Sequence, residues 1–175
     1  MTDYDVKGEN RKVPFILPDI ITEEQLIEIL KKTRRVHHRT AFVMGFYQCM
    51  RISEIVNLTE KDIDRTLKLL YLKQAKGHKD RHIPIAPETM KYLKNIPMKC
   101  GIRALQMAWN SITKKVLGKR LNFHLLRHSG ITHYITKKRW DIMMVQRMAG
   151  HSKIATTQIY THINPTDLVE RMWEK

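Results

Sequence analysis

The sequence predicts a mainly α-helical domain with one small antiparallel β-sheet or hairpin, which is an α+β fold. Helical spacing of apolar residues recurs along most of the 175-residue chain, and 42% of the residues are hydrophobic, enough for a packed core. Between residues 67 and 85 two short apolar runs instead flank the turn-like stretch 76–80, as in a β-hairpin. We expect an extended leader over residues 1–21, one domain over 22–163 and a tail helix over 164–175.

The first helices are predicted from caps and apolar runs. Thr22, followed by Gln25, forms a capping box that predicts a helix ending near Lys32. The residues that this helix is expected to bury are Leu26, Ile27 and Leu30. The nearly all-apolar run 41–47 predicts a central helix over about residues 38–50, and Ser53 is expected to cap a short helix after it.

The strands and the later helices follow in order. Residues 67–72 and 81–85 are predicted strands, and Pro84 favours an edge position for the second. Helical patterns resume over residues 87–95, and an apolar stripe typical of a core-facing helix follows at Ile102, Leu105, Trp109, Ile112 and Val116. Further helix starts are predicted at Asn122, Asp141 (with its end at Gly150), Thr156 and the Asn164-Pro165 pair.

The charge distribution predicts a polyanionic partner. The 32 Lys and Arg exceed the 17 Asp and Glu by 15, and residues 89–140 contain 12 basic residues and no acidic one. Nucleic acid is favoured over a membrane surface, because the apolar positions are few enough to be used by an ordinary core. The candidate DNA contacts in this stretch are Lys114, Lys115, Lys119 and Arg120.

Secreted and membrane-spanning classes are disfavoured. Cys49 and Cys100 are too few for a disulfide scaffold and lack zinc-site spacing, so both are expected to pack as small hydrophobes in a reducing, cytoplasmic setting. No stretch approaches the about 18 apolar residues of a membrane span, and the first residues lack the apolar centre of a signal peptide.

His124 and Arg127 lie three residues apart and so share one face of a predicted helix. A simple interpretation of this pair alone is a basic helix that rests on DNA phosphates. Zinc binding by His124 and His128 is a weaker alternative. Leu125 stands where the helical zinc-protease motif has its glutamate, a third ligand is not evident, and Arg127 would place a positive charge beside the metal. No metal or cofactor is expected.

Four segments in order resemble the catalytic domain of tyrosine recombinases, the phage integrase family. They are MRISEIVNL (50–58), KGHKDRHIPI (76–85), FHLLRHSGITHYI (123–135) and MAGHSKIATTQIYTH (148–162). The resemblance extends over residues 22–164, and it departs at Gln48-Cys49-Met50, where the family usually has a Thr-Gly-Leu-like turn.

The resemblance implies a set of catalytic residues. They are Arg51, Lys76, His124, Arg127, His151 and the nucleophile Tyr160, with Glu54 as an acidic support for Arg51. Taken singly, Tyr160 could be a packed aromatic, Lys76 a turn lysine and His151 a capping residue; the joint pattern favours a site. Lys79 and Arg81 are expected either to touch the DNA backbone or to lie on a solvated turn. The histidines without a matched role, expected at the surface or on DNA, are His37, His38, His78, His82, His133 and His162.

The implied activity is site-specific DNA recombination through a 3′-phosphotyrosine link, on double-stranded DNA and without metal or ATP. A type IB topoisomerase-like activity and a non-catalytic DNA-binding protein are the alternatives. By resemblance we expect a homotetramer on two DNA sites, and a monomer or weak oligomer when free, with a tail that docks on a neighbouring subunit or folds back in cis. Family members normally carry an N-terminal clamp domain, so the chain is expected to be a fragment or a short form.

Overall fold

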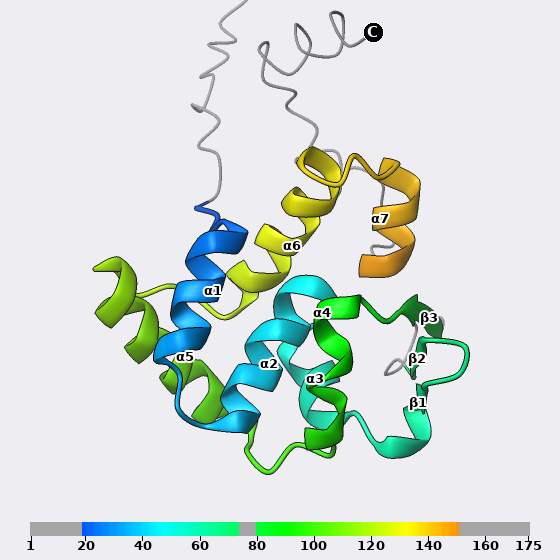
Figure 1. The fold of residues 1–175 in the computed structure, drawn as a ribbon, viewed down its shortest axis with the longest axis horizontal. Coiled ribbons are helices and arrows are strands. Elements are labelled where there is room, and N and C mark those ends of the chain that lie inside the picture. Colours follow the sequence, from blue (N-terminus) through cyan, green and yellow to red (C-terminus); the bar gives the residue numbers. More distant parts are fainter. Residues whose placement is uncertain (1–18, 74–79, 151–175) are drawn as a thin grey trace, which may run out of the picture.

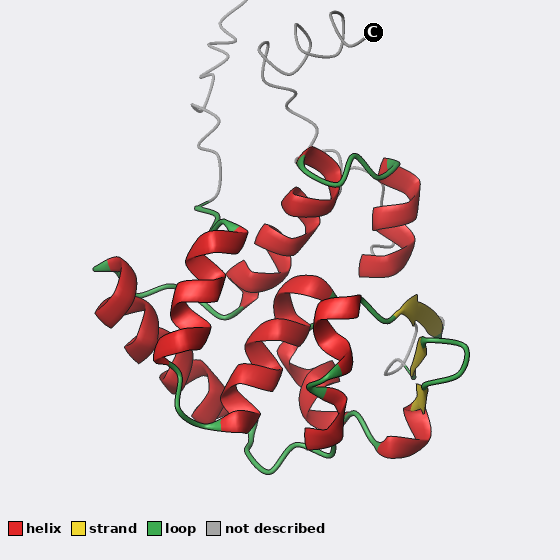
Figure 2. Ribbon diagram, in the orientation of Figure 1, coloured by secondary structure: helices red, strands yellow, loops and turns green. Residues whose placement is uncertain are grey.

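A computed structural model describes residues 19–73 and 80–150 of the chain. Helices pack around a central helix, and a small sheet lies at one side of the bundle (Figures 1 and 2). The helices are α1 (Glu23–Lys32), α2 (Val36–Tyr47), α3 (Ile52–Asn57), α4 (Pro87–Met90), α5 (Ile102–Leu117), α6 (His124–Thr136) and α7 (Ile142–Ala149), with 3-10 helices η1 (Glu60–Asp62) and η2 (Leu93–Asn95). The strands are β1 (Ile63–Asp64), β2 (Leu69–Leu72) and β3 (Arg81–Pro84). The mainly helical fold with a small antiparallel sheet is therefore confirmed.

Helix α2 forms the centre of the core, as its apolar sequence predicts. All residues from Thr40 to Tyr47 are buried. The helix packs against α4 and α5, and most extensively against α6. Phe42 stacks edge to face on Trp109 of α5, with ring centroids 4.9 Å apart. The helix begins at Val36 and ends at Tyr47, earlier than the predicted 38–50, because Cys49 takes a positive φ of 48° that a helix cannot contain.

The sheet has the order β1-β2-β3, and both pairs of strands are antiparallel. Pro84 lies on β3 and pairs with Leu69 of β2, and β3 is an edge strand as predicted. The predicted hairpin is therefore part of a three-stranded sheet, because the two-residue strand β1 joins it. A strand of two residues is too short for its sequence to reveal.

Several predicted elements are confirmed and others are corrected. The Thr22 capping box and the α7 boundaries at Asp141 and Gly150 are confirmed. Ile27 is exposed and Ile29 is buried instead, and the stripe on α5 buries Leu105 and Trp109 but leaves Ile102, its first residue, exposed. Residues 87–95 form α4 and η2 rather than one helix, and Arg51, not Ser53, is the N-cap of α3.

The end of the predicted leader is anchored on α6. The side chain of Ile21 is buried, and its backbone N donates to Ser129 Oγ at 2.9 Å. Residues 1–18, the expected helix at Thr156 and the tail helix lie outside the described residues. No helix in the described ranges has the length and apolarity that a bilayer span requires.

Gly130 allows α6 to approach α2 closely. A Cβ at this position would overlap the backbone oxygen of Phe46 and lie 3.0 Å from Cys49 Sγ. We expect Gly130→Ala to lower the free energy of unfolding by about 2–3 kcal/mol, because backbone cannot move aside as a flexible side chain can. Urea denaturation checks this. Gly101→Ala, where a Cβ meets nothing within 4 Å, is the matched control and is expected to cost at most about 1 kcal/mol. Equal losses in both variants would contradict the close approach.

Candidate active site

Arg51 lies at the entrance of α3, directly after the turn that ends α2. Its backbone is extended, with φ −72° and ψ 149°, and it serves as the N-cap. Glu54 Oε2 accepts from the backbone N of Arg51 at 2.7 Å, and Glu54 Oε1 accepts from Arg51 Nη1 at 2.9 Å. The side chain of Arg51 remains 37% exposed, so a ligand can reach it. The first turn of α3 thus fixes the backbone of Arg51 and one nitrogen of its accessible guanidinium group.

Cys49 stands where the resembling turn has a glycine, and it takes the left-handed backbone conformation that glycine favours. Its φ is 48°, and its side chain is fully buried. Burial raises the pKa of the Cys49 thiol to about 12, although the charges of Arg127 and Arg81 act in the opposite direction. Cys49 therefore takes a conformation that glycine would favour at this turn, and Arg51 after it has an ordinary extended backbone.

Arg127 projects from α6 into the protein interior, where 2% of it is exposed. Its Nη1 donates to the backbone oxygen of Cys49 at 2.6 Å, and its Nη2 donates to that of Ala149 at 2.7 Å. Burial, together with the charge of Arg51, lowers the pKa of Arg127 to about 10, which still leaves it charged at neutral pH. Arg127 thereby ties the ends of α2 and α7 to α6.

Arg81 was expected on a DNA backbone or a solvated turn, and its placement corrects both expectations. Its side chain on β3 is 9% exposed and faces the protein. Its Nη1 and Nη2 donate to the two carboxylate oxygens of Glu54 at 2.9 and 3.0 Å, and its Nε donates to the backbone oxygen of Met148 at 3.2 Å. The signal in the sequence was the alternation of β3, which places Arg81 on the buried face with Ile83.

Glu54 is the carboxylate that these two arginines share. Burial alone would raise the pKa of Glu54, but the hydrogen bonds and charge of Arg81, and the bonds from Arg51, outweigh burial and lower it. Glu54 is therefore ionised at neutral pH. Its oxygens contact Arg51, the arginine with which the resemblance associates it.

The C-terminal end of α7 faces this arginine cluster, which consists of Arg51, Arg81 and Arg127. Three successive backbone oxygens, those of Met148, Ala149 and Gly150, accept from Arg81, Arg127 and Arg51 respectively, the last at 3.4 Å. The last carbonyls of a helix lack intrahelical partners and form the negative end of its dipole, so they suit guanidinium donors. Figure 1 shows α7 beside α6 and next to β3, the strand that carries Arg81.

His124 is the first residue of α6 and is exposed, one turn before Arg127. Its partial burial and the charges of Arg127 and Arg51 lower its pKa below 6.5, so the imidazole is neutral at pH 7. Its ring lies edge to face with that of His128, with centroids 4.4 Å apart. In the described ranges no group of three or more His, Cys, Asp or Glu is arranged to hold a metal ion.

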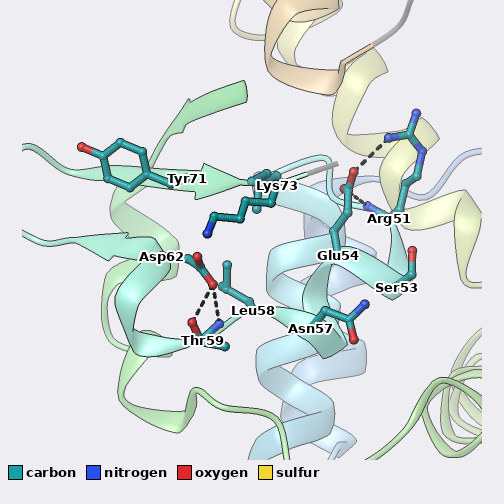
Figure 3. A pocket seen from close by; sticks show the side chains of 10 residues that line it. Arg51, Ser53, Glu54, Asn57, Leu58, Thr59, Asp62, Tyr71 and Lys73 are labelled. Carbon is teal, nitrogen blue, oxygen red and sulfur yellow. Dashed lines mark hydrogen bonds and ion pairs between the residues drawn. The ribbon is translucent and has the colours of Figure 1, made fainter. Parts of the chain in front are cut away.

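A cleft of about 650 Å³ opens between α3 and the sheet, next to Arg51. Figure 3 shows Arg51 and Glu54 at one end of this cleft and Tyr71 at the other, with Lys73 between them. Ser53, Asn57 and Thr59 contribute further polar atoms to its wall. The cleft gives an extended ligand access to the exposed guanidinium group of Arg51.

The structure brings the pair Arg51 and Glu54 near the pair His124 and Arg127, although the first belongs to α3 and the second to α6. Lys76, Lys79, His151 and Tyr160, together with His78 and His162, lie outside the described residues. The candidate DNA contacts Lys114, Lys115, Lys119 and Arg120 are exposed at and after the end of α5, and Lys119 pairs with Asp19 at 2.7 Å. His133 was expected at the surface but is buried, because it lies on the face of α6 that packs against Phe46.

Known proteins resemble the chain in sequence and in fold. The sequence model of the phage integrase family matches residues 20–106 and 101–167. Tyrosine recombinase XerA of Pyrococcus horikoshii is 31% identical over 94% of this chain and 64% of its own length, and tyrosine recombinase XerC of Pseudomonas fluorescens is 30% identical over 90% and 59%. The chain thus spans less than two thirds of these curated relatives.

Solved structures share the fold. A crystal structure of XerA recombinase superposes with a TM-score of 0.76 at 23% identity, covering 91% of this chain and 67% of that one. The post-cleavage complex of the XerH site-specific recombinase with a palindromic difH substrate superposes with a TM-score of 0.74 at 23% identity, covering 95% and 56%. The chain therefore shares the arrangement of helices and sheet of these two recombinase structures.

Proposed function

The chain belongs to the phage integrase family, and we propose that it carries the catalytic site of a site-specific DNA recombinase. The observation that supports this most directly is the arginine cluster. Among the described residues, the carboxylate of Glu54 pairs with Arg51 and Arg81, while Arg127 donates to two backbone oxygens. The three guanidinium groups and this one carboxylate therefore carry an excess of 3 − 1 = 2 positive charges. Such an excess beside an open cleft suits a phosphodiester, whose negative charge grows during transesterification.

The described residues have distinct roles in this proposal. Arg51, the accessible guanidinium group, donates a planar fork to two phosphate oxygens. Arg127 uses two of its five N–H donors in the described contacts, and it supplies positive potential from below the phosphate. His124, neutral at pH 7, holds or accepts the proton of the attacking hydroxyl.

The remaining roles follow from the family motifs. We propose Tyr160 as the nucleophile, His151 as a further donor to the phosphate and Lys76 as the acid that protonates the leaving 5′ oxygen. The tyrosine oxygen bonds to phosphorus as the 5′ oxygen leaves, which creates a 3′-phosphotyrosine link. Because the new P–O bond to tyrosine conserves the free energy of the broken phosphodiester bond, rejoining requires no ATP. Double-stranded DNA in the cytoplasm is the proposed partner.

A covalent adduct tests the proposal. The chain is incubated with a pool of nicked duplexes of random sequence and run on a denaturing gel. We expect an adduct with the wild type and none with Tyr160→Phe, because phenylalanine lacks the attacking oxygen. Tyr71→Phe, a second tyrosine beside the cleft, is the matched control and is expected to form the adduct.

Other outcomes identify the alternatives. DNA retention without an adduct would indicate a non-catalytic DNA-binding protein, and an adduct that survives Tyr160→Phe would refute the assigned nucleophile. Relaxation of supercoiled plasmid irrespective of sequence would indicate a topoisomerase-like activity.

We further propose a homotetramer on two DNA sites, with the tail docked on a neighbouring subunit. This rests on the family resemblance. Light scattering of the chain with and without DNA, compared with a chain truncated after Asn164, tests it. A tetramer that forms equally well without the tail would exclude docking in trans.

A further inference from the structure

We infer that Arg81 is a positioning residue for the cleavage site: it orients Arg51 through Glu54 and holds the C-terminal end of α7. The inference rests on the proposed function, and it assigns to Arg81 a role that its motif position does not indicate. Arg81 touches neither solvent nor the cleft to a significant extent, since 9% of its side chain is exposed. It therefore acts through its protein neighbours.

The first link runs through the carboxylate of Glu54. Each of its two oxygens accepts from both arginines: Oε1 from Arg81 Nη1 and Arg51 Nη1, both at 2.9 Å, and Oε2 from Arg81 Nη2 at 3.0 Å and the backbone N of Arg51 at 2.7 Å. A bidentate guanidinium pair fixes the plane of the carboxylate. Arg81 thereby prevents rotation of the Glu54 carboxylate, and this fixed carboxylate in turn holds Arg51 in place.

The second link runs to α7. Arg81 Nε donates to the backbone oxygen of Met148, and the end of the Arg81 side chain lies against Gly150. A Cβ at Gly150 would be 2.8 Å from Arg81 Nη1 and 2.9 Å from its Cδ and Cζ. Arg81 thus contacts both the last turn of α7 and Gly150, the residue that ends this helix.

The charge balance gives a further reason for an arginine here. Glu54 alone would neutralise Arg51 and weaken its attraction for a phosphate. Because Arg81 shares the same carboxylate, the cluster keeps its positive excess while Arg51 remains fixed. Stability alone does not account for this pair, since the cost of desolvating two buried charges offsets most of their attraction.

Arg81→Lys tests the inference, because it keeps a positive charge but loses the planar fork and the Nε donor. We expect the single-turnover cleavage rate at saturating DNA to fall about 100-fold, as for a catalytic group displaced by about 1 Å, with the affinity for DNA unchanged. Gly150→Ala, which pushes on the same guanidinium group without changing any arginine, is expected to lower the rate in the same sense. Rates are measured well below the melting temperature of each variant, so that loss of folded protein does not contribute.

Arg65→Lys is the matched control. Arg65 forms an exposed ion pair with Glu60 at 2.9 Å, away from the cluster, and the variant is expected to cleave at the wild-type rate. Wild-type cleavage by Arg81→Lys would overturn the inference, and lost DNA affinity with an unchanged rate would instead indicate a DNA contact. A wild-type chain that forms no adduct would refute the proposed function, and the positioning role with it.

Discussion

Arg127→Ala is expected to lower the free energy of unfolding by about 3 kcal/mol or more. The variant removes two charged hydrogen bonds, leaves the carbonyls of Cys49 and Ala149 without those donors and opens a cavity between three helices. For a domain of this size the melting temperature should fall by about 6–12 °C. Thermal unfolding followed by circular dichroism measures the change.

The control for this prediction is Arg103→Ala, a truncation of an exposed arginine on α5. It is expected to change the free energy of unfolding by less than about 0.5 kcal/mol, because surface side chains contribute little. A similar loss of unfolding free energy in both variants would mean that the hydrogen bonds of Arg127 to the ends of α2 and α7 do not stabilise the fold. Arg127→Lys, which keeps a charge in the interior, separates the roles further, since it should fold better than the alanine variant and still cleave DNA poorly.

Arg127 contributes to the stability of the fold and, in the proposed mechanism, to catalysis, so a loss of activity alone does not distinguish the two roles. Its side chain lies on α6 and donates to backbone oxygens at the ends of α2 and α7, so its removal disturbs the packing of these helices as well as the proposed phosphate site. Arg51 differs, because it is 37% exposed and lies at the edge of the cleft. Comparison of variants at Arg51 and at Arg127 therefore distinguishes the loss of a phosphate contact from the loss of helix packing.

Local signals in the sequence predicted the elements that depend on neighbouring residues. The capping box at Thr22, the cap at Asp141 and the terminating Gly150 each act within a few residues, so their effect is visible in the sequence. The apolar stretch before Cys49 predicted the central helix, but its end did not follow from hydropathy. The left-handed conformation of Cys49 sets that end, and cysteine does not favour this conformation.

The parts of the site that depend on distant residues were predicted unevenly. The motifs identified Arg51, His124 and Arg127, because the family keeps these residue types in a fixed order. The role of Arg81 was not predicted, since its partner Glu54 is 27 residues away and a basic residue after a turn is usually solvated. A charged residue on the inward face of an alternating strand is the signal that would have indicated a buried ion pair.

Glu54→Ala is the second change expected to have a large effect, with a loss of about 3–5 kcal/mol in the free energy of unfolding. The carboxylate is 11% exposed and is the partner of two guanidinium groups, one of them buried. Its removal leaves Arg81 charged in the interior without the carboxylate that pairs with it. Urea denaturation at pH 7 measures the effect.

Glu60→Ala provides the comparison, because Glu60 forms a pair with Arg65 in which both side chains are about half exposed. An exposed pair is expected to contribute less than about 1 kcal/mol. If the two glutamate variants lose the same stability, burial of the Glu54 pair has no energetic consequence, and the description of the arginine cluster is wrong.

The pH dependence of stability follows from the lowered pKa of Glu54. The folded protein binds this proton less tightly than the unfolded chain, whose carboxyl titrates near 4.5. The contribution of ionised Glu54 is therefore complete above about pH 4.5 and is lost as the pH falls through the lower folded value. In Glu54→Gln this titration is absent, so its stability should decline less steeply than that of the wild type in the same acidic range. Parallel curves for the two proteins would show that the carboxylate is not held ionised by Arg81 and Arg51, and the charge balance of the proposed phosphate site would then have to be revised.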